Sequence, residues 1–535
     1  MFQVLKNGLF YKPEKKLSMA AKFFEKNAYY IVFCLALLPI LVLRDFTPTN
    51  ELRYLSIADE ALRNHTFFSF TNHGEPYTDK PPLYLWFVML SKWLFNSHQM
   101  LFLSLVSLIP AIAIVKIMDK WTEPELGENN RNIAGMMLLT SAFFTGLAVT
   151  LRMDMLMCLF IVLALRSFYQ MATTPQLDKK ASWLFPIYIF LAIFTKGPVG
   201  LLVPLCSTVV FLLWTRKIKQ IGKYWGWRTW GVLLVGCIIW FSAVFLEGGK
   251  DYLNNLLFHQ TLDRAVNSFR HQEPFYYYCK TIWYSLAPWS FLVVGLLVAA
   301  LGKRLILTQL QRFYCTVALT TFIVLSLISS KLEIYMLPAF PFMVYLAVLY
   351  LPRFKDKVWI NILFAIPAAL FVIVLPTVIF LSLFSDLTYL RHWAVYAAAA
   401  ILAASGLMAL HNISRLQKDV YVGIRMLAIS FTCTLYMLGW ALPSINPWIG
   451  YKDLCQTAQN IAERKETTNF AAWNVRRAEN IDVYLGNPVQ IIPDSEEAKT
   501  HLLHNTVLML PVSHLSSFEI KESWTVGKYA VIFLE

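Results

Sequence analysis

Residues 358–384, VWINILFAIPAALFVIVLPTVIFLSLF, form an unbroken run of 27 residues without a charged side chain. A helix needs about 20 apolar residues to cross the hydrocarbon core of a bilayer, so this run is long enough to span a membrane. Similar apolar stretches recur along the first 440 positions of the chain. The whole sequence has 535 residues, of which 57% are hydrophobic and only 15% charged. This composition predicts an all-α polytopic membrane protein and argues against a soluble enzyme.

Thirteen stretches are predicted to cross the membrane. They are residues 28–43, 99–118, 132–150, 154–171, 182–195, 198–214, 229–246, 282–301, 313–329, 335–351, 358–384, 393–411 and 422–441. A further apolar stretch, residues 81–95, is shorter than the roughly 20 residues that a span requires, so we expect it to lie as a helix at the membrane interface.

The charges of the loops predict the orientation of the chain. Basic residues concentrate in the cytoplasmic loops of membrane proteins. With the N-terminus in the cytoplasm, the cytoplasmic segments contain 24 Lys and Arg against 9 Asp and Glu, whereas the outer loops contain 12 against 13. Residues 1–27 are basic, and no small-residue cleavage site follows the first apolar stretch, which therefore predicts an uncleaved first helix.

Residues 445–535 differ from the rest because no apolar run in them is long enough to cross a membrane. Predicted helices at 452–463 and 496–504 alternate with predicted strands at 469–475, 489–492, 507–512 and 529–534. This alternation predicts a small α/β domain on the outer face, after a membrane domain of residues 1–444. The eight cysteines contain no CxxC pair and lie mostly in apolar stretches, so neither a zinc module nor a disulfide scaffold is predicted.

Polar side chains gather in the outer loops, at the boundary of the membrane. Glu51 begins a stretch that predicts an amphipathic surface helix, and Lys80 precedes the two prolines that open the interfacial helix. Helix N-termini present free N–H groups to anions, so a phosphate can dock beside Lys80. Arg152 and Asp154 separate two predicted spans, where ionised groups are costly unless they are paired or functional. The other charged or histidine positions at this level are Lys196, His259, Arg264, His271 and Lys331.

These residues predict one shared polar cavity at the outer face. A lipid-phosphate-linked sugar would suit it, because its phosphate needs cations, its tail an apolar groove, and the acceptor hydroxyl a general base. Lys and Arg would then stabilise the charge of the leaving polyprenyl phosphate. Each residue also has a structural alternative, such as an ion pair for Asp154 or a snorkelling side chain for Lys80.

The order of several short motifs resembles the bacterial branch of the protein O-mannosyltransferase superfamily, and most closely the lipid A aminoarabinose transferases, the ArnT family. The motifs are Asn50-Glu51-Leu52-Arg53-Tyr54, Asp79-Lys80-Pro81, Asp154, Thr195-Lys196-Gly197, the stretch from His271 to Phe275, and Ser330-Lys331-Leu332 with Tyr335. The resemblance implies a GT-C glycosyltransferase of the bacterial inner membrane. Such an enzyme moves a sugar from undecaprenyl phosphate to an acceptor at the periplasmic face, with no role for nucleic acid.

The resemblance also implies roles for individual residues. The family has an Asp at the position of Asn50, and an amide cannot act as a base, so we assign the acid function to Glu51 and Asp154 and a hydrogen-bonding role to Asn50. The expected ligands of the donor phosphate are Lys80, Arg264, Lys196, Tyr335 and Lys331. The expected contacts of substrate or acceptor are Arg53, Tyr54 and Arg152. Asp79 with His271 or His259 is a candidate for a divalent metal ion, although this spacing is a poor metal signature.

Two alternatives remain open from the sequence. A transporter or flippase of lipids or lipid-linked sugars would also carry charged residues, but it would place them in the middle of broken spans, whereas here they crowd the outer loops. The sequence also leaves open the sugar and the acceptor, which the family resemblance allows to be lipid A, another glycan or a protein.

Overall fold

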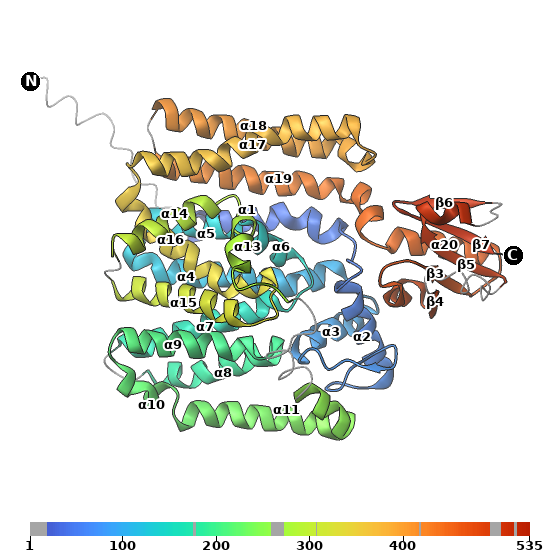
Figure 1. Ribbon diagram of the computed structural model, residues 1–535, viewed down its shortest axis with the longest axis horizontal. Coiled ribbons are helices and arrows are strands. Elements are labelled where there is room, and N and C mark those ends of the chain that lie inside the picture. Colours follow the sequence, from blue (N-terminus) through green and yellow to red (C-terminus); the bar gives the residue numbers. More distant parts are fainter. Residues whose placement is uncertain are drawn as a thin grey trace, which may run out of the picture.

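The computed structural model describes residues 19–174, 178–257, 272–305, 308–416, 419–492, 504–517 and 522–534. Most of the chain is a slab of roughly aligned helices, and a small sheet domain lies at one end of it (Figure 1). The helices of the slab are α1 (Met19–Leu43), α4 (Met100–Leu126), α5 (Glu128–Leu139), α6 (Ala142–Val149), α7 (Asp154–Thr173), α8 (Lys179–Lys196), α9 (Val199–Trp214), α10 (Ile221–Tyr224), α11 (Trp227–Asn254), α13 (Tyr277–Ser285), α14 (Ser290–Gly302), α15 (Gln309–Leu327), α16 (Phe340–Phe354), α17 (Val358–Phe384), α18 (Trp393–His411) and α19 (Val420–Ile449).

Within the described ranges, eight helical segments are long and apolar enough to cross a membrane, and α5 with α6 makes a ninth if this pair, bent by 69°, is one span. All thirteen predicted stretches fall on helices, but some are too short or too broken to qualify alone, as where α13 and α14 replace the single predicted span at 282–301. The chain is therefore a multi-pass membrane protein. The predicted interfacial helix is α3 (Leu83–Phe95), which has 13 residues.

The burial of the spans follows their position in the slab. The span from Glu333 to Phe354, a 3₁₀ helix followed by α16, is 94% buried over its apolar window and forms the centre. By contrast, the windows of α11, at one edge of the slab, and of α17, beside α18 near the opposite edge, are only 22% buried (Figure 1). Their exposed side chains are apolar, for example Ile238 and Leu246 on α11. In a bilayer lipid chains would cover these faces, so the apolar sequence needs no protein partner there.

The sheet domain follows α19. It contains α20 (Lys452–Arg464), the short α21 (Asp482–Leu485), and five strands in the order β4-β3-β5-β7-β6. The strands are β3 (Phe470–Trp473), β4 (Val489–Ile492), β5 (Thr506–Pro511), β6 (Ser523–Val526) and β7 (Tyr529–Leu534). The three neighbours β4, β3 and β5 are parallel, whereas β7 pairs antiparallel with β5 and β6. This mixed α/β arrangement confirms the fold class predicted for the C-terminal region, and the predicted helix at 496–504 falls mostly outside the described residues.

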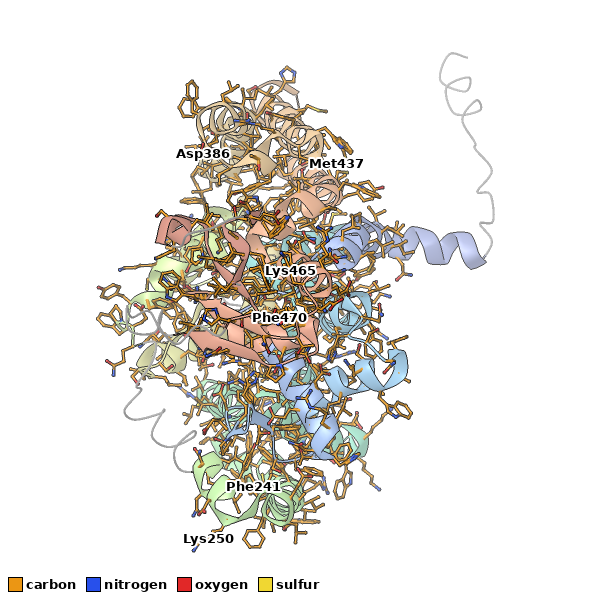
Figure 2. All side chains as sticks on the ribbon, turned by 90° about the vertical axis from the view of Figure 1, so that its right-hand side faces the viewer. Phe241, Lys250, Asp386, Met437, Lys465 and Phe470 are labelled. Carbon is orange, nitrogen blue, oxygen red and sulfur yellow. The ribbon has the colours of Figure 1, made fainter. Side chains whose placement is uncertain are left out.

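The first outer loop lies between the slab and the sheet domain (Figure 1). It contains α2 (Glu51–Asn64), a hairpin of β1 (Thr71–Asn72) and β2 (Glu75–Pro76), and α3. One hydrophobic cluster joins this loop to the sheet domain, since Leu55 and Ile57 of α2 are buried together with Ile461 and Val531. Viewed from the domain end, the sheet around Phe470 lies over the middle of the slab, between Phe241 at one edge and Met437 at the other (Figure 2).

Residues on both sides of a kink in α11 contact the first outer loop. Gly249 adopts φ 77°, a left-handed conformation that favours glycine and bends the helix near its end. Beyond the kink, the Tyr252 hydroxyl accepts a hydrogen bond from the Phe70 amide at 2.9 Å and donates one to the Tyr77 carbonyl at 2.8 Å. Glu247 accepts the backbone N–H groups of residues 67–69. These contacts hold the segment that leads to Lys80.

Candidate active site

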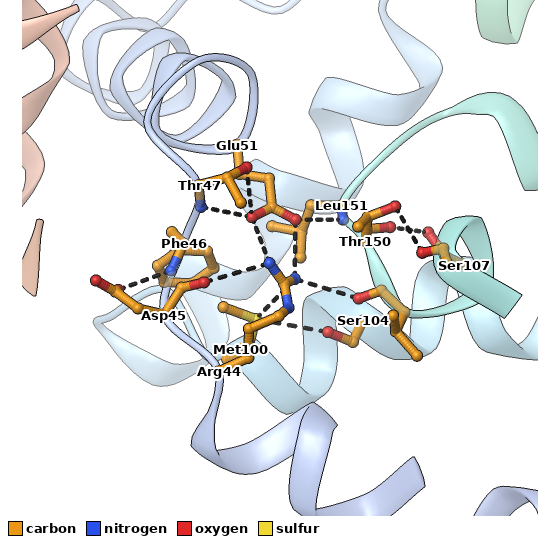
Figure 3. A network of polar contacts seen from close by, with 12 residues as sticks. Arg44, Asp45, Phe46, Thr47, Glu51, Met100, Ser104, Ser107, Thr150 and Leu151 are labelled. Atoms are coloured by element: carbon orange, nitrogen blue, oxygen red, sulfur yellow. Dashed lines mark hydrogen bonds and ion pairs between the residues drawn. The ribbon is translucent and has the colours of Figure 1, made fainter. Parts of the chain in front are cut away.

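A brace made by Arg44 and Glu51 underlies the candidate site (Figure 3). Arg44 follows α1, and its two terminal nitrogens contact the two Glu51 oxygens at 2.6 and 2.8 Å. Glu51 also accepts hydrogen bonds from the Thr47 amide at 2.6 Å and the Leu151 amide at 2.7 Å. The side chain of Glu51 is only 1% exposed and that of Arg44 8%. The pair therefore connects the first outer loop to the turn that carries Arg152 and Asp154.

Asp154, at the first turn of α7, lies between two cations. Its carboxylate accepts a hydrogen bond from Arg152 Nε at 3.2 Å and forms an ion pair with Lys196, at the end of α8. The Lys196 ammonium also lies 4.7 Å from the centre of the Tyr335 ring. Burial disfavours the charge of Arg152, but the neighbouring Asp154 outweighs this effect and raises the pKa of the guanidinium. The Arg152 guanidinium therefore stays charged beside Asp154.

A second group of charges comes from the first outer loop. Lys80 Nζ lies 2.8 Å from the Asp79 carboxylate, and both side chains keep nearly a fifth of their surface exposed. Arg53 lies 5.6 Å from the ring centre of Tyr77 and donates to the Asn50 side chain at 3.2 Å. Its Nε is buried and has no hydrogen-bond partner among the described residues, so a donor remains available there.

Electrostatic interactions join the two groups into one site. Lys196 interacts with both Arg152 and Lys80, and Arg53 interacts with Asp79. Tyr54 interacts with Arg53, Arg152, Asp79 and Asp154. Burial raises the pKa of Tyr54, so its hydroxyl stays protonated and can donate a hydrogen bond. Among the described residues, the site contains four cations, Arg53, Lys80, Arg152 and Lys196, against the two carboxylates Asp79 and Asp154.

The structure brings most of the predicted site residues together, with some exceptions. Lys331 is 3% exposed and donates to the carbonyl of Glu273 at 2.8 Å, so it fastens two loops to each other. Arg264, His259 and His271 lie outside the described residues. In the part of the chain that the structure describes, no group of three or more His, Cys, Asp or Glu side chains could hold a metal ion. Asp79 is engaged by Lys80, so the described residues do not fit a metal site.

Two residues of the site were not singled out from the sequence. Arg44 ends the first predicted span and resembles any basic residue at a membrane boundary. Tyr84 of α3 is fully buried and packs edge-on against Tyr54 with 5.7 Å between the ring centres, and its hydroxyl has no hydrogen-bond partner in the part of the chain that the structure describes. An aromatic residue on an apolar interfacial helix carries no distinctive signal in the sequence. The role of both depends on partners that are distant along the chain.

No known family model matches the sequence. An uncharacterized protein of Aquifex aeolicus is 26% identical over 324 residues, which cover 58% of this chain and 62% of that protein. An undecaprenyl phosphate-alpha-4-amino-4-deoxy-L-arabinose arabinosyl transferase of Shewanella sediminis is 26% identical over 313 residues, 57% of this chain and 55% of that protein. The chain thus matches somewhat more than half of the length of these relatives.

The solved structures give a fuller match. ArnT from Cupriavidus metallidurans, in its crystal structure bound to undecaprenyl phosphate, has a TM-score of 0.72 and 19% identity, covering 95% of this chain and 98% of ArnT. The apo structure of the same protein has a TM-score of 0.71. These similarities confirm the predicted resemblance to ArnT and the predicted fold, a polytopic helical membrane protein with a small C-terminal sheet domain.

Proposed function

We propose that this chain is an undecaprenyl-phosphate-sugar-dependent glycosyltransferase, which moves a sugar to an acceptor at the periplasmic face of the inner membrane. The observation that carries the proposal is the excess of cations over carboxylates at one end of the apolar helical slab, the end beside the sheet domain. The sequence relatives named arabinosyl transferases and the fold shared with ArnT support it. We place the N-terminus in the cytoplasm and the sheet domain, approximately residues 445–535, in the periplasm, as the loop charges predict.

In this proposal the phosphate of the donor binds among Arg53, Lys80, Arg152 and Lys196. Charge-assisted hydrogen bonds to phosphate oxygens are the strong kind, and Arg53 has a donor available for one. The two carboxylates neutralise only part of the positive charge before the donor arrives. Arg264, predicted from the family resemblance, would add to this set. A polyprenyl monophosphate is therefore favoured over a neutral lipid.

The proposed reaction is a displacement at the anomeric carbon of the sugar. Asp154 takes the proton of the acceptor hydroxyl, the acceptor oxygen forms a bond to this carbon, and the bond from this carbon to the phosphate oxygen breaks. The cations stabilise the charge that develops on the departing polyprenyl phosphate. In the free protein Asp154 is paired with Lys196 and Arg152. Binding of the phosphate would draw these cations toward it and leave the carboxylate available as a base.

Asp154 is a better candidate for the base than Glu51. Both Glu51 oxygens accept hydrogen bonds, from Arg44, Thr47 and the Leu151 amide. Taking up a proton would sacrifice several of these bonds in a buried place. Asn50 stands where the family has an Asp, and its amide can orient Arg53 and a substrate hydroxyl.

A reconstituted assay tests the proposal. The purified protein in liposomes would receive a polyprenyl-phosphate-linked sugar and, in parallel, lipid A, a glycan or a protein as acceptor. We expect sugar transfer with release of polyprenyl phosphate, and we expect Lys80→Ala and Asp154→Ala to abolish it. Lys217→Ala should retain activity, because Lys217 lies between α9 and α10, at the end of the slab away from the sheet domain. Movement of the intact donor across the bilayer without release of polyprenyl phosphate would show a flippase instead.

A further inference from the structure

The carboxylate of Asp45 is buried beside the brace and is held by the sheet domain. Its Oδ2 accepts a hydrogen bond from the backbone N–H of Lys452, the first residue of α20, at 2.8 Å. Its Oδ1 accepts from the Phe46 amide at 2.7 Å and from the hydroxyl of Tyr484 in α21. Asp45 thus satisfies a free N–H at the start of α20 from a position 407 residues earlier in the chain.

Two residues at the end of α19, Asn446 and Gly450, also lie against Asp45. The side chain of Asn446 donates to the Leu43 carbonyl at 2.8 Å and accepts from the Asp45 amide at 3.1 Å. At Gly450, a Cβ atom would lie 2.0 Å from Asp45 Oδ2, so only glycine permits the approach. The backbone of Gly450, with φ −117° and ψ −174°, is in a region open to any residue. The requirement for glycine is therefore steric and specific to Asp45.

From Asp45, a short chain of contacts leads to the candidate base. Arg44 donates to the Asp45 carbonyl at 3.2 Å and to the Val149 carbonyl at 3.2 Å while it binds Glu51. Glu51 in turn accepts the amide of Leu151, three residues before Asp154. Each of these groups is buried or half-buried, so a displacement at one end is transmitted through packed atoms.

We propose that Asp45 is a positioning residue through which the C-terminal sheet domain sets the geometry of the Arg44–Glu51 brace and of the turn from Leu151 to Asp154. This inference rests on the proposed function, because it assigns the sheet domain a role in the transfer step. The domain acts without touching the substrate. Its docking fixes the segment from which Asp154 and Arg152 project.

Two substitutions disturb Asp45 from the sheet domain, and a third serves as a matched control. Gly450→Ala adds one methyl group against the carboxylate, and Tyr484→Phe removes one hydrogen bond to it. Tyr451→Phe also deletes a buried hydroxyl of the domain, but this hydroxyl donates to the Arg476 carbonyl and does not touch Asp45. We expect kcat to fall about tenfold or more in Gly450→Ala and severalfold in Tyr484→Phe, because misplacement by about 1 Å is costly in catalysis.

Three readouts separate positioning from a loss of stability. The fall in kcat should exceed any rise in KM for the donor, because Lys80 and Lys196, two of the four proposed phosphate ligands, lie outside the brace and the turn from Leu151 to Asp154. In a protein that already carries Asp45→Ala, adding Gly450→Ala should lower kcat little further, because the new methyl group no longer meets the Asp45 carboxylate. Tyr451→Phe should lower the unfolding temperature as much as Tyr484→Phe but leave kcat unchanged; equal kcat losses in the two would overturn the proposal.

Hydrogen exchange tests the same link without any transfer assay. We expect the amides of residues 149–153 to exchange faster in Gly450→Ala than in the unmodified protein and in Tyr451→Phe, because the brace that protects the Leu151 amide loosens. Unchanged exchange there would contradict the proposed link even if the protein is an active transferase. Faster exchange in a protein that transfers no sugar would support the link and reject the proposed function.

Discussion

Replacing Asp154 by Asn is the most informative single change at the candidate site. The substitution keeps the shape of the side chain but leaves the Lys196 ammonium, 7% exposed, without its counter-charge. Breaking a buried ion pair by removing one partner costs about 3–5 kcal/mol of stability. Arg152 is 27% exposed and hydrated, so its lost pairing adds only about 1 kcal/mol at most. We therefore expect a large fall in the unfolding temperature, measured by intrinsic tryptophan fluorescence in detergent.

The effect on transfer must be separated from this loss of stability. Loss of a general base lowers kcat by about 10²–10⁴-fold. Lys196→Met removes the buried cation, so the double variant with Asp154→Asn should regain much of the lost stability. If Asp154 is the base, the Asn substitution should still lower kcat by at least about 100-fold in the Lys196→Met background.

The assay is transfer of a labelled sugar from its polyprenyl phosphate donor in liposomes, at a temperature well below the unfolding of every variant. Lys217→Ala serves as the control for handling and reconstitution. If Asp154→Asn costs nothing further in the Lys196→Met background, Asp154 is only the counter-ion of Lys196. The assignment of the base would then be wrong.

Three other changes probe separate contacts. Lys80→Ala should weaken binding of undecaprenyl phosphate by about 1.5–3 kcal/mol, or roughly 10–150-fold, measured by ligand-dependent thermal stabilisation. Glu51→Gln should destabilise the protein by about 3–5 kcal/mol but keep kcat within about tenfold below the unfolding temperature; a 100-fold loss would restore Glu51 as a candidate base. Burial opposes ionisation of Asp59, yet His98 and Lys92 outweigh it and lower its pKa, so this carboxylate stabilises the fold above pH about 4 and the benefit disappears as pH falls through the lowered pKa. Asp59→Asn should therefore lower the unfolding temperature at pH 7, with a difference that closes below pH about 4.

Hydropathy predicted the helices because a span must satisfy its backbone internally, which requires one long apolar run. It could not predict the interruptions. The break between α5 and α6, at Thr140 and Ser141, lies inside an apolar run. The hydroxyls of both residues donate to carbonyls in the last turn of α5, and the segment after α13 supplies two further bonds, from Ala142 N–H to the Ala287 carbonyl and from Trp289 Nε1 to the Thr140 hydroxyl. The break between α13 and α14 is different, because Pro288 lies in it and a proline inside a helical pattern ends or kinks the helix; hydropathy alone does not register this signal. The break at Thr140 and Ser141 contains no proline or glycine, so it depends on contacts that a single apolar run does not encode.

At the candidate site, the structure brings several of the predicted charged residues close together, but the sequence did not indicate how they pair. Asp154 and Lys196 are separated by 42 residues, and only the packing of α7 against α8 brings them together. Glu51 was expected to act as an acid, but residues that read as ordinary loop positions, such as Thr47 and Leu151, occupy its oxygens. A charged residue at a membrane boundary has the same appearance in sequence whether it binds a ligand, forms an ion pair or braces a loop.

The distribution of charge distinguishes the two carboxylates Glu51 and Asp154 at the candidate site. Glu51 is matched by Arg44 alone and saturated by backbone and side-chain donors, so it forms a neutral, closed unit. Asp154 is instead shared by two cations, Arg152 and Lys196, and Lys196 also interacts with Lys80, so the unit around Asp154 stays positive. In the proposed function, an arriving phosphate would be attracted by the positive charge of the second unit and would gain little from the neutral first unit. Ligand binding can therefore rearrange the partners of Asp154 while the brace beneath it stays intact.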